Sequence, residues 1–290
     1  MIRSMTGFGK ASIDFDGKKI SAEIKTLNSK MNDTKLRIPS TYREKELSVR
    51  NKIADALVRG KIDAFISIEN SNSEATSSIN ENLATEYHSQ LKSLGEKLGE
   101  NGNYMSLLLR MPGVMETAQY EPNDDEWKNI WTVLEQALNG VNQFREDEGA
   151  QMETDLIKRI SNIENHLNGV LKLAPQRTLE KKEKLNAKFK EQLEEFEGLD
   201  KNRFEQELIY YLEKLDITEE EVRLKSHLEY FRSTMKNGSA QGKKLGFISQ
   251  EMGREINTIG SKANHAEMQK HVVQMKDELE KIKEQVLNIL

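Results

Sequence analysis

The sequence contains no cysteine, which excludes disulfide bonds, thiolate catalysis and cysteine-ligated zinc. Only four prolines occur among 290 residues, and Pro175 is the last, so little interrupts helix formation in the C-terminal part. No apolar run approaches the roughly 20 residues that span a bilayer, and the N-terminus lacks the apolar core of a signal peptide. These absences favour a soluble cytoplasmic protein that does not enter a membrane.

The chain is long enough for one large core or two modest ones, and we expect two. Its net charge of −5 argues weakly against nucleic-acid binding, but the charge is unevenly distributed. Residues 1–70 hold 14 Lys and Arg against 9 Asp and Glu, residues 71–215 hold 17 against 27, and residues 216–290 hold 12 against 12. A polyanion would therefore bind at the N-terminal end.

The first 70 residues predict a small mixed sheet, in the order three strands, one helix and one strand. Apolar and polar residues alternate through residues 20–25, 35–38 and 61–68, which is typical of half-buried strands. A helix over residues 42–58 is expected to turn inward Leu47, Ile53, Ala54 and Leu57. The polar strand face carries Lys25, Lys35 and Arg37. These cations indicate either a surface that follows the phosphates of a polyanion or an ordinary solvated face.

Helical periodicity dominates from residue 126 onward, after a helix at residues 79–98. Apolar steps of three and four predict two long arms, forming an antiparallel hairpin broken near residues 172–177. A final helix over residues 261–286 carries an apolar seam that packs within the chain or between subunits. Its members are Val272, Met275, Leu279, Ile282, Val286 and Ile289.

These patterns predict an α+β protein with a small N-terminal sheet domain and a largely helical C-terminal region. We expect an α+β domain with a basic sheet face at residues 1–150, long helical arms at 151–215, and a helical domain with a polar groove at 216–290.

The most informative stretch is residues 216–267, where charged residues border the apolar stripes of two helices. Polar groups at such borders are costly unless they are used. One helix presents a carboxylate, a guanidinium and an imidazole, and the other presents two carboxylates one turn apart and a guanidinium. We expect these groups to converge in one groove. They are Glu220, Arg223, His227, Glu251, Arg254 and Glu255.

These residue types would suit cleavage of a phosphodiester, which needs an activated nucleophile, stabilisation of charge on phosphate and a proton for the leaving oxygen. Glu251 and Glu255 would supply two ligands to Mg²⁺ or Mn²⁺, and His227 a third. Arg223 and Arg254 would neutralise phosphate. A metal-free route is also open, in which His227 takes the proton of the RNA 2′-hydroxyl and a cyclic phosphate forms.

Each of these residues also has a structural interpretation. On spacing alone, His227 beside Glu220 is more typical of a histidine satisfied within a helical core than of a catalytic one. Glu251, Arg254 and Glu255 would also suit an ion-pair network that fixes the register of two helices. Two further motifs are weak: residues 242–244, Gly-Lys-Lys, would hold phosphate at a helix start, and Ser261 in residues 260–264 would serve as an N-cap.

Segments at both ends closely resemble the YicC/YloC family of bacterial endoribonucleases. In the C-terminal part these segments are RLKSHLEYFR, GKKLGFISQEMGREINTIGSK and VVQMKDELEKIKEQV, and in the N-terminal part they are IRSMTGFG, the Leu-Asn-Ser-Lys of residues 27–30 and RGKID at 59–63. Arg145, Glu146 and Glu148 in FREDEGAQMETDL match another family motif, although pairing on a helix surface would explain them equally well. The chain departs from the family pattern at Lys30, Gly253, His265 and Leu290.

The resemblance implies an endoribonuclease that forms a homo-oligomer, a hexameric ring or barrel. With the metal ligands proposed above, we expect a divalent-metal-dependent enzyme of RNA turnover that uses no nucleotide cofactor. The resemblance also favours His227, Glu251, Glu255, Arg223 and Arg254 as catalytic residues. The RNA-binding residues expected with them are Arg3, Lys25, Lys30, Lys35, Arg37, Lys243, Lys244 and Lys262. Two other functions remain open on the residues alone: an RNA-binding adaptor that presents small RNAs to another nuclease, and a structural coiled-coil protein.

Overall fold

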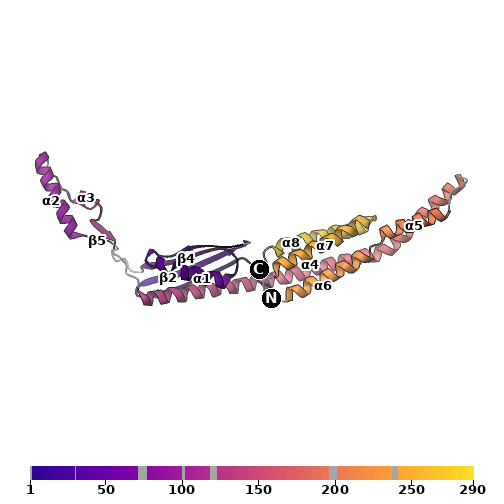
Figure 1. Ribbon diagram of the computed structural model, residues 1–290, viewed down its shortest axis with the longest axis horizontal. Coiled ribbons are helices and arrows are strands. Elements are labelled where there is room, and N and C mark those ends of the chain that lie inside the picture. Colours follow the sequence, from indigo (N-terminus) through magenta and orange to yellow (C-terminus); the bar gives the residue numbers. More distant parts are fainter. Residues whose placement is uncertain are drawn as a thin grey trace.

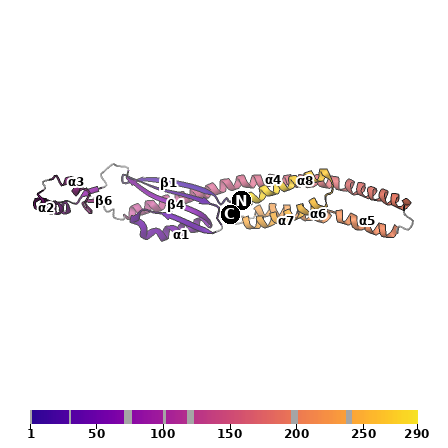
Figure 2. The same cartoon turned by 90° about the horizontal axis from the view of Figure 1, so that it is seen from above.

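The computed structural model describes residues 2–29, 31–70, 77–99, 102–117, 123–195, 201–236 and 241–290. One helix of 72 residues, α4 (Asp124–Glu195), runs through most of the length of an elongated molecule (Figure 1). A β-sheet lies against the first half of α4, and helices from the C-terminal part pack against its second half (Figures 1 and 2). The predicted α+β class is confirmed.

The sheet has four strands in the order β1-β2-β4-β3, in which β3 runs parallel to β4 and the other pairs are antiparallel. The predicted order of three strands, a helix and a strand is confirmed. The elements are β1 (Gly7–Phe15), β2 (Lys18–Leu27), β3 (Asn32–Arg37), a 3₁₀ helix (Ser40–Lys45), α1 (Glu46–Leu57) and β4 (Gly60–Asn70).

One face of the sheet is buried against α1 and residues 130–141 of α4, as the alternation of residues 20–24 predicts. The expectation that Leu47 faces this core is wrong, because its side chain is exposed. Residues 40–45 form a 3₁₀ helix, so the α-helical stripe begins only at Glu46, and Val49 takes the inward position ahead of Ile53 and Leu57.

Residues 77–117 form a small separate unit at the end of the molecule away from the helical bundle (Figure 1). It contains the two-stranded pair β5 (Ser77–Ile79) and β6 (Met115–Thr117) and the helices α2 (Glu81–Leu98) and α3 (Met105–Leu108). The expected helix at residues 79–98 is therefore present. It begins after Asn80, whose side chain accepts a hydrogen bond from the backbone of Leu83 and caps the first turn.

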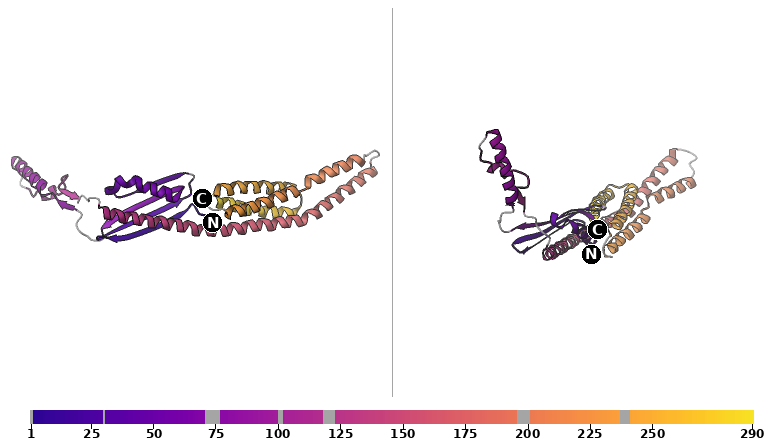
Figure 3. Two further views of the ribbon diagram at one scale, coloured as in Figure 1. Left: turned by 60° about the horizontal axis from the view of Figure 1, so that its bottom comes forward. Right: turned by 60° about the vertical axis from the view of Figure 1, so that its left-hand side comes forward.

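The predicted break near residues 172–177 is wrong, because α4 continues through Pro175 (Figure 3). Proline removes one backbone donor, but Arg177 in the following turn anchors the helix to its neighbours. Its guanidinium donates to the carbonyl oxygens of Lys262 at 2.8 Å and Leu215 at 2.6 Å.

The chain instead reverses beyond the end of α4. The helix α5 (Lys201–Leu215) returns beside the last part of α4, and the rings of Phe189 and Phe204 stack with their centroids 3.7 Å apart. The apolar steps of three and four residues continue along the sequence to Leu193 and Phe196. The side chains of these two residues lie outside the described part of the chain.

The second half of α4 forms a bundle with α6 (Thr218–Lys236), α7 (Gly242–Lys262) and α8 (Ala266–Val286). The predicted seam of α8 is buried within the chain, because it packs against α4 and α7. The prediction of a single helix over residues 261–286 is wrong, because α7 ends at Lys262 and α8 begins at Ala266. The prediction of Ser261 as an N-cap is also wrong, because this residue lies in the last turn of α7. His265 is the N-cap of α8 and accepts a hydrogen bond from the backbone of Met268.

The two chain ends meet beside the middle of α4, as the markers N and C show in Figure 1. Met5 donates its backbone N–H to the carbonyl oxygen of Asn288 at 2.8 Å, and Leu290 donates to Arg3 at 2.9 Å. The N-terminal signature thus joins the C-terminal tail to the sheet. Among the described residues, no helix is long and apolar enough to cross a membrane.

Candidate active site between α6 and α7

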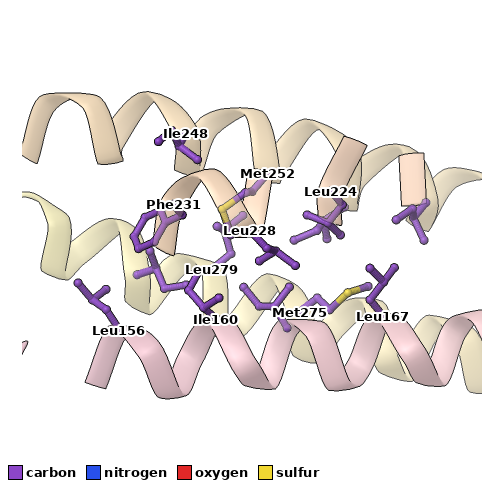
Figure 4. Packing of buried hydrophobic residues seen from close by; sticks show 14 of the residues in the cluster. Leu156, Ile160, Leu167, Leu224, Leu228, Phe231, Ile248, Met252, Met275 and Leu279 are labelled. Atoms are coloured by element: carbon purple, nitrogen blue, oxygen red, sulfur yellow. The ribbon is translucent and has the colours of Figure 1, made fainter. Parts of the chain in front are cut away.

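The candidate site lies along the line of contact between α6 and α7, called here the α6/α7 seam. Leu224, Leu228 and Phe231 of α6 are fully buried, because their three- and four-residue spacing places them on one face. Figure 4 shows this face directed into the bundle centre, among Met252 of α7 and Leu279 of α8. This packing fixes which side chains lie on the borders of the seam.

An ion pair fixes the register of the two helices. The Lys262 ammonium lies 2.8 and 3.0 Å from the two carboxylate oxygens of Glu220, which is buried. The pair joins the first turn of α6 to the last residue of α7, so these helices run antiparallel. Lys262, expected to bind RNA, is engaged here by a carboxylate.

The same register places His227 level with Glu255. Each lies seven residues along its helix from the Glu220–Lys262 pair, and the two helices have the same rise per residue. Glu255 is only 8% exposed and His227 is half-buried. Within the described part of the chain, neither side chain makes a hydrogen bond or an ion pair. A carboxylate that is largely buried without a partner is costly, so this position requires an explanation.

The other candidate residues lie on the solvent-exposed flanks of the seam. Glu251 is half-buried and pairs with the exposed Arg254 at 2.9 Å on the same helix. Arg223 is exposed and pairs with Glu219 one turn earlier on α6. The structure therefore places His227 and Glu255 at the seam and leaves Glu251 and the two arginines beside it.

No group of three or more His, Asp or Glu side chains in the described residues is arranged to hold a metal ion. His227, Glu251 and Glu255 are thus not gathered into a three-ligand set within one chain. Mg²⁺ needs fewer protein ligands, since it commonly keeps several waters and is held by one or two carboxylates together with substrate phosphate. The two glutamates, one turn apart on α7, suit that kind of site and not a closed protein cage.

Known proteins match this chain along its length. Two family models match, the N-terminal region of YicC-like endoribonucleases over residues 2–154 and their C-terminal region over residues 170–290. The chain belongs to the YicC-like family. A protein of Clostridioides difficile named "Probable endoribonuclease YicC" is 33% identical over 293 residues, and one of Haemophilus influenzae with the same name is 30% identical over 291 residues. Both alignments cover 100% of each chain.

The residues of this YicC-like chain expected to bind RNA lie in several places. Lys243 and Lys244 are exposed in the first turn of α7, where Lys244 lies over the ring of Tyr230. Arg3 pairs with Glu146 at 2.5 Å beside the chain ends. Lys30 lies outside the described residues.

The remaining three lie on the sheet. Lys25 pairs with Glu23 at 2.6 Å, and this hydrogen-bonded pair lowers the pKa of Glu23. Lys35 and Arg37 are exposed on β3 and form no ion pair with any described residue.

Sequence periodicity missed the role of Arg145. This arginine is fully buried and donates to the carbonyl oxygens of Leu57 at 3.1 Å and Met5 at 3.2 Å, so surface pairing does not explain it. Burial, with a smaller contribution from the charge of Arg3, lowers its pKa to about 10. The sequence could have indicated this burial, because Arg145 follows Val141 by four residues and therefore lies on the same apolar face of the helix.

The neighbouring motif residues hold the N-terminal signature. Glu146 binds Arg3, and Glu148 accepts a short hydrogen bond from the hydroxyl of Thr6. This family motif therefore joins the two halves of the molecule and lies apart from the seam.

Proposed function

We propose that this chain is an endoribonuclease whose cleavage centre is the α6/α7 seam, with His227 and Glu255 as its central pair. The observation that carries the proposal is the nearly buried Glu255 carboxylate, which has no partner among the described residues and lies level with a half-buried imidazole. Such a pair is typical of a site that moves protons. Membership of a family named for endoribonuclease activity supports RNA as the substrate.

A route that uses the residues of this chain begins with His227 taking the proton of an RNA 2′-hydroxyl. The 2′-oxygen then bonds to the adjacent phosphorus, the bond from phosphorus to the 5′-oxygen breaks, and the 5′-oxygen takes up a proton as it leaves. Glu255 would accept a hydrogen bond from the imidazole and stabilise its protonated form. The guanidiniums of Arg223 and Arg254, on the flanks of the seam, would neutralise the phosphate.

The proposal includes a requirement for Mg²⁺ or Mn²⁺, because carboxylates and an imidazole are ligands that these ions accept. Glu251 and Glu255 would hold the ion together with His227, and water and substrate phosphate would complete its coordination. When bound, the ion would stabilise the negative charge that develops on the phosphate. The two routes leave different products, a 2′,3′-cyclic phosphate from attack by the 2′-hydroxyl and a 5′-phosphate from attack by water.

We further propose that the protein acts in the cytoplasm as a homo-oligomer, a hexamer by the family resemblance. The unit formed by residues 77–117 supports assembly, because it buries few apolar side chains and exposes many. A two-stranded pair with short helices is marginally stable without further cover. Its exposed apolar residues are Ile79, Leu94, Leu98, Met105, Leu107, Leu109 and Met115.

The deciding experiment compares Glu255→Gln with Glu280→Gln, a matched change at an exposed glutamate of α8. Glu255→Gln should lower the cleavage rate by about 10²- to 10⁴-fold and leave RNA affinity within about twofold, because the amide keeps the shape but cannot take or balance a proton. Glu280→Gln should cleave at the wild-type rate. Undiminished cleavage by repurified Glu255→Gln protein would exclude the seam as the cleavage centre.

Two measurements then separate the routes. Loss of cleavage in chelator and in Glu251→Gln, with 5′-phosphate ends, would support the metal requirement. Persistence in chelator with cyclic-phosphate ends would exclude it. If no repurified form of the protein cleaves RNA yet all bind it, the chain is an RNA-binding adaptor.

A further inference from the structure

The outer face of the sheet is a second exposed surface, distinct from the seam. The helices that contact the sheet, α1 and α4, lie against its inner face, which holds the buried side chains (Figures 1 and 3). Strand residues of the opposite parity point to the other side. The central part of this side, called here the outer sheet face, carries Phe8, Lys10, Glu23, Lys25, Lys35, Arg37, Asp63 and Phe65.

Strand register places these residues in two rows that cross the sheet. In one row Phe8 lies beside Lys25, Lys25 beside Asp63, and Asp63 beside Lys35. In the other, the order is Lys10, Glu23, Phe65 and Arg37. Each row thus contains one phenylalanine and two cations.

The two phenylalanines are exposed on a face that has no apolar core of its own. Phe8 is 42% and Phe65 49% exposed, and their strand neighbours on the inner face complete the core without them. The Lys25 ammonium lies 5.6 Å from the centre of the Phe8 ring, so a cation already stands beside this aromatic surface. Exposed aromatic rings among cations are typical of surfaces on which nucleic-acid bases stack.

The two rows hold four cations against two carboxylates, whereas the whole outer side of the sheet, which adds Lys19, Lys61, Asp14, Asp33 and Glu69, holds six against five. Glu23 lies 2.6 Å from Lys25 and 3.8 Å from Lys10, so one carboxylate is shared by two lysines. Lys35 and Arg37 make no ion pair within the described residues, and both lie on the edge strand β3. Their charges are available to phosphate, which is the argument for an RNA occupant in preference to a protein.

We propose that the outer sheet face binds a single-stranded segment of RNA, with two bases stacked on Phe8 and Phe65 and the phosphates on Lys35 and Arg37. This inference rests on the proposed function only in taking RNA as the ligand. In a duplex the bases stack on one another and offer no face to a protein side chain. The two rings lie on strands separated by one other strand, about 10 Å apart across the sheet, so they take two different bases. The surface therefore selects unpaired RNA for the seam.

The test measures binding and cleavage separately. The affinity of wild-type protein, Phe8→Ala, Phe65→Ala and the double variant is measured by fluorescence anisotropy with a labelled 2′-O-methyl oligouridine, which lacks the attacking hydroxyl. The blunt duplex of the same length serves as the second probe. Phe144→Ala is the matched control, because Phe144 is 45% exposed but lies on α4, away from the sheet face.

Each phenylalanine change should weaken single-strand binding by about tenfold, since stacking on one aromatic side chain contributes about 1–3 kcal/mol per base, or roughly 5- to 150-fold in affinity. Duplex binding, Phe144→Ala binding and the slope of affinity against salt should stay unchanged, because no charge is removed. Phe65→Tyr should restore affinity. Cleavage of a long RNA by the double variant should persist when RNA is in large excess.

Two results would overturn the proposal while leaving the proposed function intact. The first is unchanged single-strand affinity in the double variant when the wild type still cleaves RNA. The second is an altered oligomeric mass with unchanged affinity, which would assign the face to contact between subunits. If the wild-type protein neither binds nor cleaves RNA, both proposals fail.

Discussion

The two halves of α4 contact the rest of the protein in different ways. In the first half the helix backbone approaches β1 so closely that a Cβ atom at Gly9 would lie 2.1 Å from the carbonyl oxygen of Ala137. In the second half, whole side chains such as Ile160 and Leu167 fill the space between α4 and the other helices. The contact of Gly9 with α4 therefore admits no added atom, whereas Ile160 and Leu167 contribute by filling a volume.

The same halves differ in what they leave accessible. The sheet half leaves a complete face with cations and aromatic rings, and the helical half leaves a narrow seam with an acid and an imidazole. Our two proposals therefore assign RNA binding and bond cleavage to separate parts of the molecule, which are joined by α4 and by Arg145 at the junction. Changes in one half should alter stability or binding without altering the chemistry of the other.

The largest effect is expected from Gly9→Ala. The added methyl group would meet the backbone of α4, which cannot move without breaking helix hydrogen bonds, so we expect a loss of about 3 kcal/mol or more in the free energy of unfolding. The matched control is Gly246→Ala in α7, where the nearest atom to a new Cβ lies 3.8 Å away. That change should stabilise by about 0.5–1 kcal/mol, because glycine disfavours the helix.

Urea denaturation followed by circular dichroism measures both variants. Equal stability changes of the two variants would contradict the difference in packing. A Gly9→Ala protein that retains wild-type stability would show that β1 and α4 separate easily.

A smaller effect is expected from Glu220→Gln in the helical half. The change leaves the Lys262 ammonium beside an uncharged group in a partly buried position, which should lower stability by about 1–3 kcal/mol. Glu219→Gln, in the exposed pair with Arg223, is the control and should cost less than about 1 kcal/mol. If the two changes have equal effects, the Glu220–Lys262 pair does not hold the register that places His227 level with Glu255.

The architecture of the sheet was predictable because each strand buries one face. Alternation alone identifies Ile20, Ala22 and Ile24 as core residues, and the structure buries all three. The predicted helix break near Pro175 was wrong because the feature that decides it is not local. A proline rule is local, whereas the hydrogen bonds of Arg177 that support this part of α4 come from residues far along the chain.

The candidate site was predictable only in part. Periodicity indicates that Glu255 and His227 border apolar stripes, but the partner of each charge depends on the register between two helices, which neither helix encodes alone. Lys262 is an example: the sequence suggests a cation that is free to bind RNA, but the register of α6 and α7 places it against Glu220. Arg145 was missed because composition rules treat arginine as a surface residue.

A further prediction tests the charge on the sheet half. Replacing Lys35 and Arg37 together by alanine removes two cations that have no ion pair among the described residues, so RNA affinity should fall about tenfold at low salt. The slope of log affinity against log salt should become shallower by about 1.4, or about 0.7 for each phosphate contact with a single strand. The control replaces Lys128 and Lys270, both exposed and paired, and should leave the slope unchanged. An unaltered slope in the first variant would place RNA elsewhere.

The smallest effect concerns pH and the contact between α4 and α8. The Nδ1 atoms of His166 and His271 lie 3.1 Å apart, so the two imidazoles contact each other where α4 meets α8. Burial, and then the charge of His271, lower the pKa of His166, while Glu278 opposes the shift. Glu278 is itself engaged by Arg159 at 3.3 Å, which weakens this opposition.

The sign of the pH effect follows from that lowered pKa. In the unfolded chain His166 takes up its proton near pH 6.5, before the folded protein does, so stability is complete above about that pH and falls as the pH decreases. Each unit by which the pKa is lowered corresponds to about 1.4 kcal/mol. His271→Gln removes the repulsion and should reduce the loss of stability between neutral and mildly acidic pH, measured by urea denaturation. His88→Gln, in the separate unit of residues 77–117, should leave that loss unchanged. A steeper loss in His271→Gln would mean that the second imidazole accepts a hydrogen bond from a protonated His166 and stabilises the charge.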